Sequence, residues 1–273
     1  MAVNPDDIAD TLLDDLLDRL RAIRERIVGV LATYGAPLTH SDMRRAITEI
    51  DRLLIGWSDE GVLLTRDAVS RAASAGDNAV LDTLRAARIE VPLGYVGVSD
   101  SLLRVSQEYT ASLVQDITTD ARTRISQIVR RGALSGTPLN VMTDQIGRNL
   151  DMPGSAVGTI RKRATDIART EVSRVYNTAY WEQSSEAGQR YPELRKAWSH
   201  VNDAPGLSAF QRRNSRPDHI AMDRRTTREP IPISEPFVFP DGTRMMHPHD
   251  PTAGAKHVVG CRCRMILVTP DPE

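Results

Sequence analysis

The sequence of 273 residues has only two cysteines, few aromatic residues and almost no lysine. Two cysteines cannot form the disulfide framework of a small secreted domain. Aromatic residues make up 4% of the chain, which favours helices packed through Leu, Ile, Val and Ala. Lysine occurs only at Lys162, Lys196 and Lys256, so arginine carries nearly all of the positive charge. The composition therefore argues against a disulfide-rich scaffold and against a core built on aromatic residues.

The sequence also lacks long apolar runs and an excess of either charge. Its apolar stretches are a few residues long, whereas a membrane-spanning helix needs about 20 apolar residues in a row. The first twenty residues carry six Asp and a single Arg, unlike the basic start and apolar run of a secretory signal. The formal net charge of −1 gives no overall attraction to nucleic acid. We expect a protein of the cytosol, or of a particle assembled there, without membrane contact.

Apolar residues at intervals of three and four predict a helical body over the first 190 residues. The expected helices cover 6–31, a stretch from about Ser41, 61–75, 77–89, 100–131, 138–150 and 156–187. A linker rich in Pro and Gly is expected at 91–97. These signals divide the chain into an N-terminal helical region (1–97), a helical body (98–190) and a C-terminal module (191–273).

The C-terminal module differs in composition from the helical part. It holds eleven of the sixteen prolines, both cysteines and five of the six histidines. Short strands are expected at 196–200, 236–239 and 264–268, and Asp241-Gly242 is typical of a hairpin turn. The predicted fold class is α+β, mainly α, with a body of long helices followed by a small loop and β module.

Cys261 and Cys263 follow a group of histidines and suggest a metal site. Thiolates and imidazoles suit tetrahedral zinc, and a module with a small core gains stability from a metal. However, Cys-x-Cys is less specific than Cys-x-x-Cys, and buried thiols beside hydrogen-bonded histidines are the alternative. His247 and His249 lie in a loop rich in Pro and Asp, where exposed histidines are common.

Charged residues on the helix over 156–187 allow two interpretations. Arg174 follows Glu171 by three residues, so the two side chains can form an ion pair. Such a pair is usually part of a solvated helix face. The alternative is a polar network that docks this helix onto the C-terminal module.

Arginine clusters stand out within the balanced total charge. A solvated surface is the first interpretation, and non-specific contact with DNA phosphates or with an acidic protein surface is the second. Few aromatic residues lie among them, so base recognition is not expected. The basic residues that are candidates for DNA or partner contact are Arg161, Lys162, Arg163, Arg212, Arg213, Arg224 and Arg225.

A series of motifs in the second half of the chain points to one protein family. It runs from Ile-Ala-Arg-Thr-Glu (167–171) through Arg-Pro-Asp-His (216–219) to Val-Gly-Cys-Arg-Cys (259–263). The series resembles the phage Mu F-like minor head protein family, also called the head-morphogenesis family, over roughly residues 100–268. The residues that carry the resemblance are Arg169, Thr170, Glu171, Asn177, Trp198, Asp203, Arg216, His219 and Asp223, with Cys261 and Cys263.

The resemblance implies a minor capsid protein of a tailed phage rather than an enzyme. Such a protein would act with the portal and other head proteins in assembly, first in the host cytoplasm and then in the head interior or at the portal vertex. It would be present in several copies per particle and could contact the phage genome without sequence preference.

Two departures from the family pattern bear on the metal. Some members carry Cys-x-x-Cys where this chain has Arg216 to His219, and Gly260 stands where the family usually has Asn. A site of four thiolates is therefore not available. The remaining candidate ligands of a structural zinc are His219, Cys261, Cys263 and His257.

The alternative is a metal-dependent nuclease or hydrolase that uses the C-terminal His and Asp residues. His219, Asp223 and one of the later histidines would be its metal ligands or its base. No standard catalytic motif supports this alternative in the sequence, and no catalytic residue is assigned.

Overall fold

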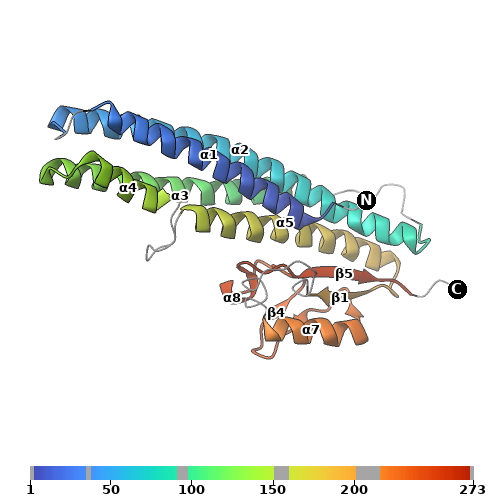
Figure 1. Cartoon of the computed structure of the whole chain (residues 1–273). Helices are drawn as coiled ribbons and strands as arrows, with labels where there is room; N and C mark the ends of the chain where they lie inside the picture. The colour runs from blue at the N-terminus through green and yellow to red at the C-terminus, as the bar shows by residue number, and fades with distance from the viewer. Residues whose placement is uncertain (1–2, 35–37, 91–97, 151–159, 201–215, 271–273) are drawn as a thin grey trace. The chain divides into compact units, whose positions relative to one another are not determined.

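A computed structural model describes residues 3–34, 38–90, 98–150, 160–200 and 216–270 and confirms the mainly helical α+β class (Figure 1). The long helices are α1 (Pro5–Ala32), α2 (His40–Ala86), α3 (Asp100–Ser135), α4 (Leu139–Leu150) and α5 (Ile160–Arg190). None of the helices described is long and apolar enough to cross a membrane.

The helices at 6–31, 100–131, 138–150 and 156–187 were predicted to within a few residues, but α2 was not. It is one continuous helix, whereas separate helices were expected from about Ser41, over 61–75 and over 77–89. Glycine within a helix costs only about 1 kcal/mol, and packing can offset this. A Cβ on Gly76 would lie 2.4 Å from the carbonyl oxygen of Tyr176, so only glycine permits this close approach. The expected linker at 91–97 lies outside the described residues.

The chain forms two compact units, and neither is a single stretch of sequence. Unit 1 comprises Met1–Ala9, Ala68–Ser106 and Arg169–Glu273, and unit 2 comprises Asp10–Asp67 and Gln107–Ala168. Helices α1, α2, α3 and α5 contribute residues to both. The units differ from the three consecutive domains (1–97, 98–190 and 191–273) expected from the sequence.

Unit 2 is a bundle of helical segments with an aliphatic core. The indole of Trp57 in α2 donates a hydrogen bond to the carbonyl oxygen of Leu16 in α1 over 3.4 Å. Arg122 of α3 forms a two-pronged ion pair with Asp51 of α2, at 3.1 and 3.2 Å. Core side chains that are at most 2% exposed include Leu16, Ile27, Leu54, Trp57, Ile117 and Ile125.

Unit 1 contains the strands that were expected near the C-terminus. Strands β1 (Arg195–Ser199), β2 (Ile231–Pro232) and β5 (Arg264–Val268) form an antiparallel sheet in the order β2-β1-β5. Strands β3 (Phe237–Val238) and β4 (Arg244–Met245) form a hairpin, and Gly242 at its turn has φ +85°. The Asp-Gly hairpin is thereby confirmed.

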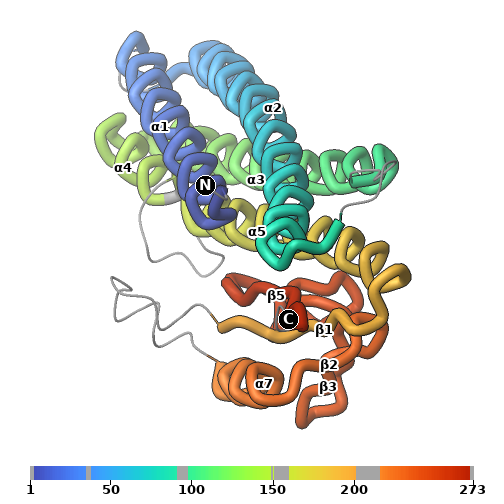
Figure 2. The backbone as a smooth tube through the Cα atoms, turned by 90° about the vertical axis from the view of Figure 1, so that its right-hand side faces the viewer, coloured from blue at the N-terminus to red at the C-terminus, as the bar shows by residue number. Residues whose placement is uncertain are grey.

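Helices of unit 1 cover the three-stranded sheet on both sides (Figure 1, Figure 2). On one side, α7 (Pro217–Arg228) packs against β1, where the Thr226 hydroxyl accepts a hydrogen bond from the backbone N–H of Trp198 at 2.8 Å. On the other side lies the part of α5 after Arg169, where the Tyr180 hydroxyl accepts one from the N–H of Leu267 at 3.0 Å. The short helix α8 (Ala255–Val258) precedes β5. The sheet thus joins the segments that carry the histidines and cysteines.

Candidate metal centre

Backbone features of α7 and β5 bring the candidate ligands together. Pro217 occupies the first turn of α7, where the fixed φ of proline suits a helix start, and this places His219 at the N-terminal end of the helix. Cys261 and Cys263 lie on the segment that leads into β5. Because β5 pairs with β1 and α7 packs on β1, the imidazole and the two thiols meet in one core.

Three of the four predicted ligands form a tight, buried cluster. The Nδ1 atom of His219 lies 3.4 Å from Sγ of Cys263 and 3.5 Å from Sγ of Cys261. His219 is 1% exposed, Cys261 6% and Cys263 2%. Their ligand atoms lie within 4.8 Å of one another, so that this group can hold a metal ion.

The fourth predicted ligand, His257, lies behind His219 and does not face the thiols. Its Nδ1 is 3.0 Å from Nε2 of His219, and its Nε2 is 3.0 Å from a carboxylate oxygen of Asp241. The two imidazole rings meet edge to edge, with centroids 5.3 Å apart and planes inclined by only 3°. Asp218, His219 and His257 form a second group with metal-ligand spacing.

One assignment of protons satisfies this whole row of groups. In this assignment, Nε2–H of His219 donates to Nδ1 of His257, and Nε2–H of His257 donates to Asp241. Nδ1 of His219 then keeps a lone pair that is directed at the sulfurs. Metal-binding histidines commonly have such support, which fixes the tautomer and the ring orientation. Without a metal, the same nitrogen can accept a hydrogen bond from a thiol.

The two thiols differ in acidity because they interact. The hydrogen bond from the Cys263 thiol is the main cause that lowers the pKa of Cys261, and the imidazoles of His219 and His249 lower it further. Burial and then the neighbouring Cys261 raise the pKa of Cys263, while the indole of Trp198 opposes this rise. The thiol of Cys261 therefore loses its proton more easily than the thiol of Cys263.

Aromatic rings enclose the cluster. Trp198 meets His219 edge to face at 5.1 Å, and Phe239 lies 4.9 Å from the ring of His257. Phe237 and Phe239 each contact Trp198 at 5.2 Å between ring centroids. These three rings give the two histidines an apolar surrounding.

Helix α5 is tied to the cysteine segment through two side chains of the motif series. The Thr170 hydroxyl accepts a hydrogen bond from the N–H of Gly260 at 3.2 Å. The Asn177 side chain donates to the carbonyl oxygen of Cys263 at 3.2 Å and accepts from the N–H of Met265 at 3.0 Å. Both residues therefore position the segment that carries the thiols.

Two further motif residues hold backbone near the site. Arg216 donates hydrogen bonds to the carbonyl oxygens of His257 at 2.9 Å and Val259 at 2.7 Å. A carboxylate oxygen of Asp223 accepts one from the N–H of His200 at 3.0 Å. Asp203, the remaining acidic residue of the series, lies outside the described residues.

Glu171 does not belong to a solvated helix face, so the first interpretation of this residue was wrong. It is 5% exposed and pairs with Arg174 at 2.7 Å. Burial raises the pKa of Glu171, whereas Arg174 and His249 act to lower it. Together with Thr170 and Asn177, this pair favours the interpretation of a polar network between α5 and the C-terminal segments.

The basic clusters are partly neutralised. Lys162 pairs with Asp166 at 2.5 Å, and Arg163 pairs with Asp120. Arg161 and Arg224 are exposed, Arg169 is half-buried in α5, and Arg225 donates to the carbonyl oxygen of Val238 at 3.3 Å. Arg212 and Arg213 lie outside the described residues. Contact of these residues with DNA stays a prediction.

Sequence reasoning missed two features of unit 1. His247 and His249 were expected to be exposed, but they are 3% and 0% exposed. Lys196 in β1 is also fully buried, and its Nζ donates to the carbonyl oxygen of Met246 at 2.7 Å. The Nζ atom lies 4.9 Å from the centre of the Phe237 ring. The sequence did contain a signal that Lys196 is buried, because this residue lies in an expected strand directly before two apolar residues.

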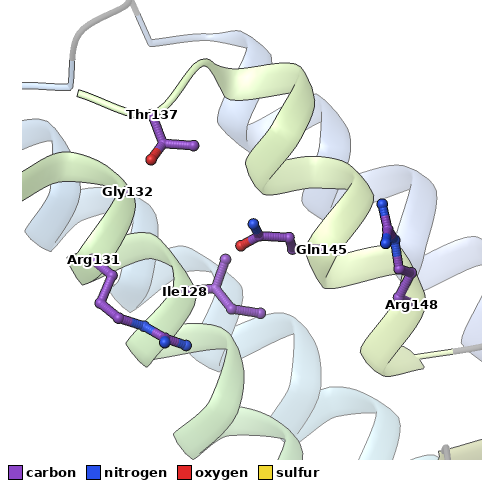
Figure 3. A pocket seen from close by; sticks show the side chains of 6 residues that line it. All are labelled: Ile128, Arg131, Gly132, Thr137, Gln145 and Arg148. Atoms are coloured by element: carbon purple, nitrogen blue, oxygen red, sulfur yellow. The ribbon is translucent and has the colours of Figure 1, made fainter. Parts of the chain in front are cut away.

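A separate hollow of about 430 Å³ lies between α3 and α4 in unit 2 (Figure 3). Its lining residues are Ile128, Arg131, Gly132, Thr137, Gln145 and Arg148. Arg148 already pairs with Asp144, and the hollow is open to solvent. We assign no function to it.

No family model, curated protein or solved structure matches the chain. The resemblance to the Mu F-like family therefore depends on the order of the motif residues. Their contacts in unit 1 are the basis for a functional interpretation.

Proposed function

We propose that the chain is a minor structural protein of a tailed-phage head, which acts in assembly with the portal and other head proteins, and that zinc holds its C-terminal module together. One observation carries the proposal. The side chains of the motif residues Thr170, Asn177 and Arg216 converge on the backbone around Cys261 and Cys263.

The contacts of these residues are those of a scaffold. Thr170, Asn177 and Arg216 use their side chains on backbone N–H and carbonyl groups of the cysteine segment. Groups engaged in this way fix a local fold and are not available to a substrate. A motif series with such contacts indicates a defined local fold and not a catalytic site. This agrees with a structural role in the phage head.

Zinc fits the donor set better than other common metals. Two thiolates and an imidazole are ligands that zinc prefers, whereas calcium and magnesium prefer oxygen. Such a site in a zinc-finger peptide contributes about 10–16 kcal/mol of apparent binding free energy. Bound zinc would neutralise the two thiolates and so oppose the rise that burial and Cys261 cause in the pKa of Cys263.

The competing function is a metal-dependent nuclease or hydrolase, and the group of Asp218, His219 and His257 is the observation that favours it. Both histidines are only 1% exposed, which leaves a substrate no direct access to them. Asp223, the acid expected to take part, already accepts hydrogen bonds from His200 and Thr227. The structural role is therefore better supported.

A tagged copy of the chain in phage-producing cells tests the role in the head. We expect the tag to sediment with assembled heads and to stay with them in high salt. Heads that assemble normally while the tagged protein remains free would contradict the proposal. Plasmid incubated with the pure protein should stay intact with or without chelator, and cleavage that His219→Ala abolishes would favour the enzyme.

A further inference from the structure

Unit 1 contains a pocket of about 460 Å³ that is separate from the metal centre. Its wall is formed by the C-terminal half of α5, the start of β1 and the residues of and after β2, and all of its lining residues belong to unit 1. His219, Cys261 and Cys263 are not among them. Pockets that bind small organic molecules have volumes of about 300–1,000 Å³, so this pocket is large enough for a ligand.

Most of the residues that line this pocket are apolar. Trp181, Leu194, Ile233 and Met246 are among them. Leu194 is 2% exposed and Ile233 is 6% exposed, so the surrounding core holds this part of the wall in place. Helix α5 lies close to it, because a Cβ on Gly188 would be 2.9 Å from Cδ1 of Ile233. The fold thus provides a preformed apolar surface for a ligand.

Arg195 is the one charged residue in the described lining of the pocket. Its backbone is fixed in the central strand, where it pairs with Pro232 of β2 and with Val268 of β5. Its Nη1 donates hydrogen bonds to the carbonyl oxygens of Pro192 at 2.8 Å and Leu194 at 3.3 Å. Because both of these residues line the pocket, the guanidinium is held at its wall.

The other donors of Arg195 have no partner among the residues that the structure describes. No carboxylate there pairs with the guanidinium, and neither Nε nor Nη2 donates a hydrogen bond. The hydroxyl of Ser185, a partly exposed residue of the same wall, likewise has no partner in that part of the chain. The planar edge of a guanidinium matches two oxygens of a carboxylate or a phosphate. Arg195 is therefore suited to bind an anion at the edge of an apolar surface.

A carboxylate fits this site better than a phosphate. One guanidinium offsets one negative charge, whereas a phosphate monoester carries a charge of about −1.5 to −2 at pH 7 and would keep part of it unpaired beside an apolar wall, which is costly. We propose that the pocket binds an apolar carboxylate, with its carboxylate on Nε and Nη2 of Arg195 and its apolar part against Trp181 and Ile233.

Two sources supply this chemistry: a free aromatic or aliphatic acid, and the C-terminal residue of a polypeptide. The probes are therefore 3-phenylpropanoate, the tripeptide Ala-Ala-Phe and the neutral amide of each. We expect each acid to bind the full chain at least about 10-fold more tightly than its amide, because hydrogen bonds between two charged groups are stronger than neutral ones. Tighter binding of the tripeptide than of 3-phenylpropanoate identifies a polypeptide end as the source, and any other order identifies a free acid.

Nuclear magnetic resonance of the ¹⁵N-labelled full chain measures these affinities and locates the site. The chain has three tryptophans, and the indole N–H signal of Trp181, assigned with Trp181→Phe, should shift as the probe binds. Arg195→Gln should abolish the preference for acid over amide. Arg190→Gln removes the same charge at the exposed end of α5 and should keep that preference. Ser185→Leu fills part of the pocket and should weaken the binding of acid and amide alike.

Several results would overturn the proposal. Absence of binding of either acid to the wild-type protein, or equal affinities for acid and amide, would exclude a carboxylate site even if Arg195→Gln does not fold. An acid preference that survives in Arg195→Gln, or a Trp181 signal that stays in place while the acid binds, would locate the binding elsewhere. The proposal depends on neither the zinc centre nor the role in a phage head, so its failure would leave both standing.

Discussion

The side-chain amide of Asn177 in α5 donates a hydrogen bond to the carbonyl oxygen of Cys263, 86 residues later in the chain, over 3.2 Å. The same NH₂ group donates to the carbonyl oxygen of Ser173 at 2.8 Å. Asn177 is fully buried, so its partners cannot turn to water if it is lost. This contact joins the helix of the Ala-Arg-Thr-Glu motif to the strand that follows the Cys-x-Cys motif.

Asn177→Asp should destabilise unit 1 by about 1–3 kcal/mol, because a buried carboxylate cannot donate a hydrogen bond to the carbonyl oxygen of Cys263. Urea unfolding followed by tryptophan fluorescence measures the change. Thr178→Ala is the matched control at the next position of α5, where the hydroxyl donates a hydrogen bond to the carbonyl oxygen of Arg174 in the same helix. It should change the free energy of unfolding by less than about 0.5 kcal/mol. Equal effects of the two substitutions would contradict the role of Asn177.

Two glycines of α2 should respond in opposite directions to alanine. At Gly76 a new Cβ would lie 2.4 Å from the carbonyl oxygen of Tyr176, so Gly76→Ala should cost about 1–3 kcal/mol. At Gly56 nothing lies within 4 Å of the new atom, so Gly56→Ala should stabilise the helix by about 1 kcal/mol. Thermal unfolding of both variants tests this. A stabilising Gly76→Ala would show that α2 and α5 do not approach so closely.

The buried lysine in β1 should make stability depend on pH. Burial is the main cause that lowers the pKa of Lys196 from 10.5 to about 7, although Asp250 and Glu235 act to raise it. Between these two values the unfolded chain binds a proton that the folded chain lacks. The free energy of unfolding therefore rises with pH across this window, by up to about 1.4 kcal/mol per pH unit, and this gain is lost as pH falls toward 7.

Lys196→Met removes this titration and should therefore abolish the rise. Urea unfolding of the wild-type protein and the variant at pH 7.5 and 9 gives the two slopes. Asp250 and the nearby His247 keep their charge states over this range, because the pKa of each is lowered in the folded protein, and titration of the thiols affects both proteins alike. The difference between the pH slopes of the two proteins thus reports the titration of Lys196. Equal slopes would contradict a buried amine that is neutral in the folded protein.

Local sequence signals predicted most of the elements of this fold. The periodicity of apolar residues predicted α1, α3, α4 and α5, and the Asp-Gly turn predicted the β3–β4 hairpin. A break was expected at Gly76 in α2, but this glycine allows a close approach by Tyr176, a residue 100 positions away. Pattern alone does not reveal whether a glycine ends a helix or allows another helix to approach.

The candidate site was predicted only in part, for a similar reason. Chemistry and motif order selected His219, Cys261 and Cys263, which the fold brings together. A loop with Pro and Asp around His249 is typical of an exposed segment, yet this loop is buried through contacts with distant residues. Glu171 was misjudged in the same way, because the segments that cover it are distant in sequence.

Zinc content of the purified chain tests the central claim of a metal-held C-terminal module most directly. The full chain, produced in ordinary medium and purified under reducing conditions without chelator, should contain about one zinc per molecule by plasma mass spectrometry. The double variant Cys261→Ser, Cys263→Ser should contain almost none. A wild-type protein that neither carries zinc nor takes it up when titrated, or a double variant with the same zinc content as the wild type, would contradict the account.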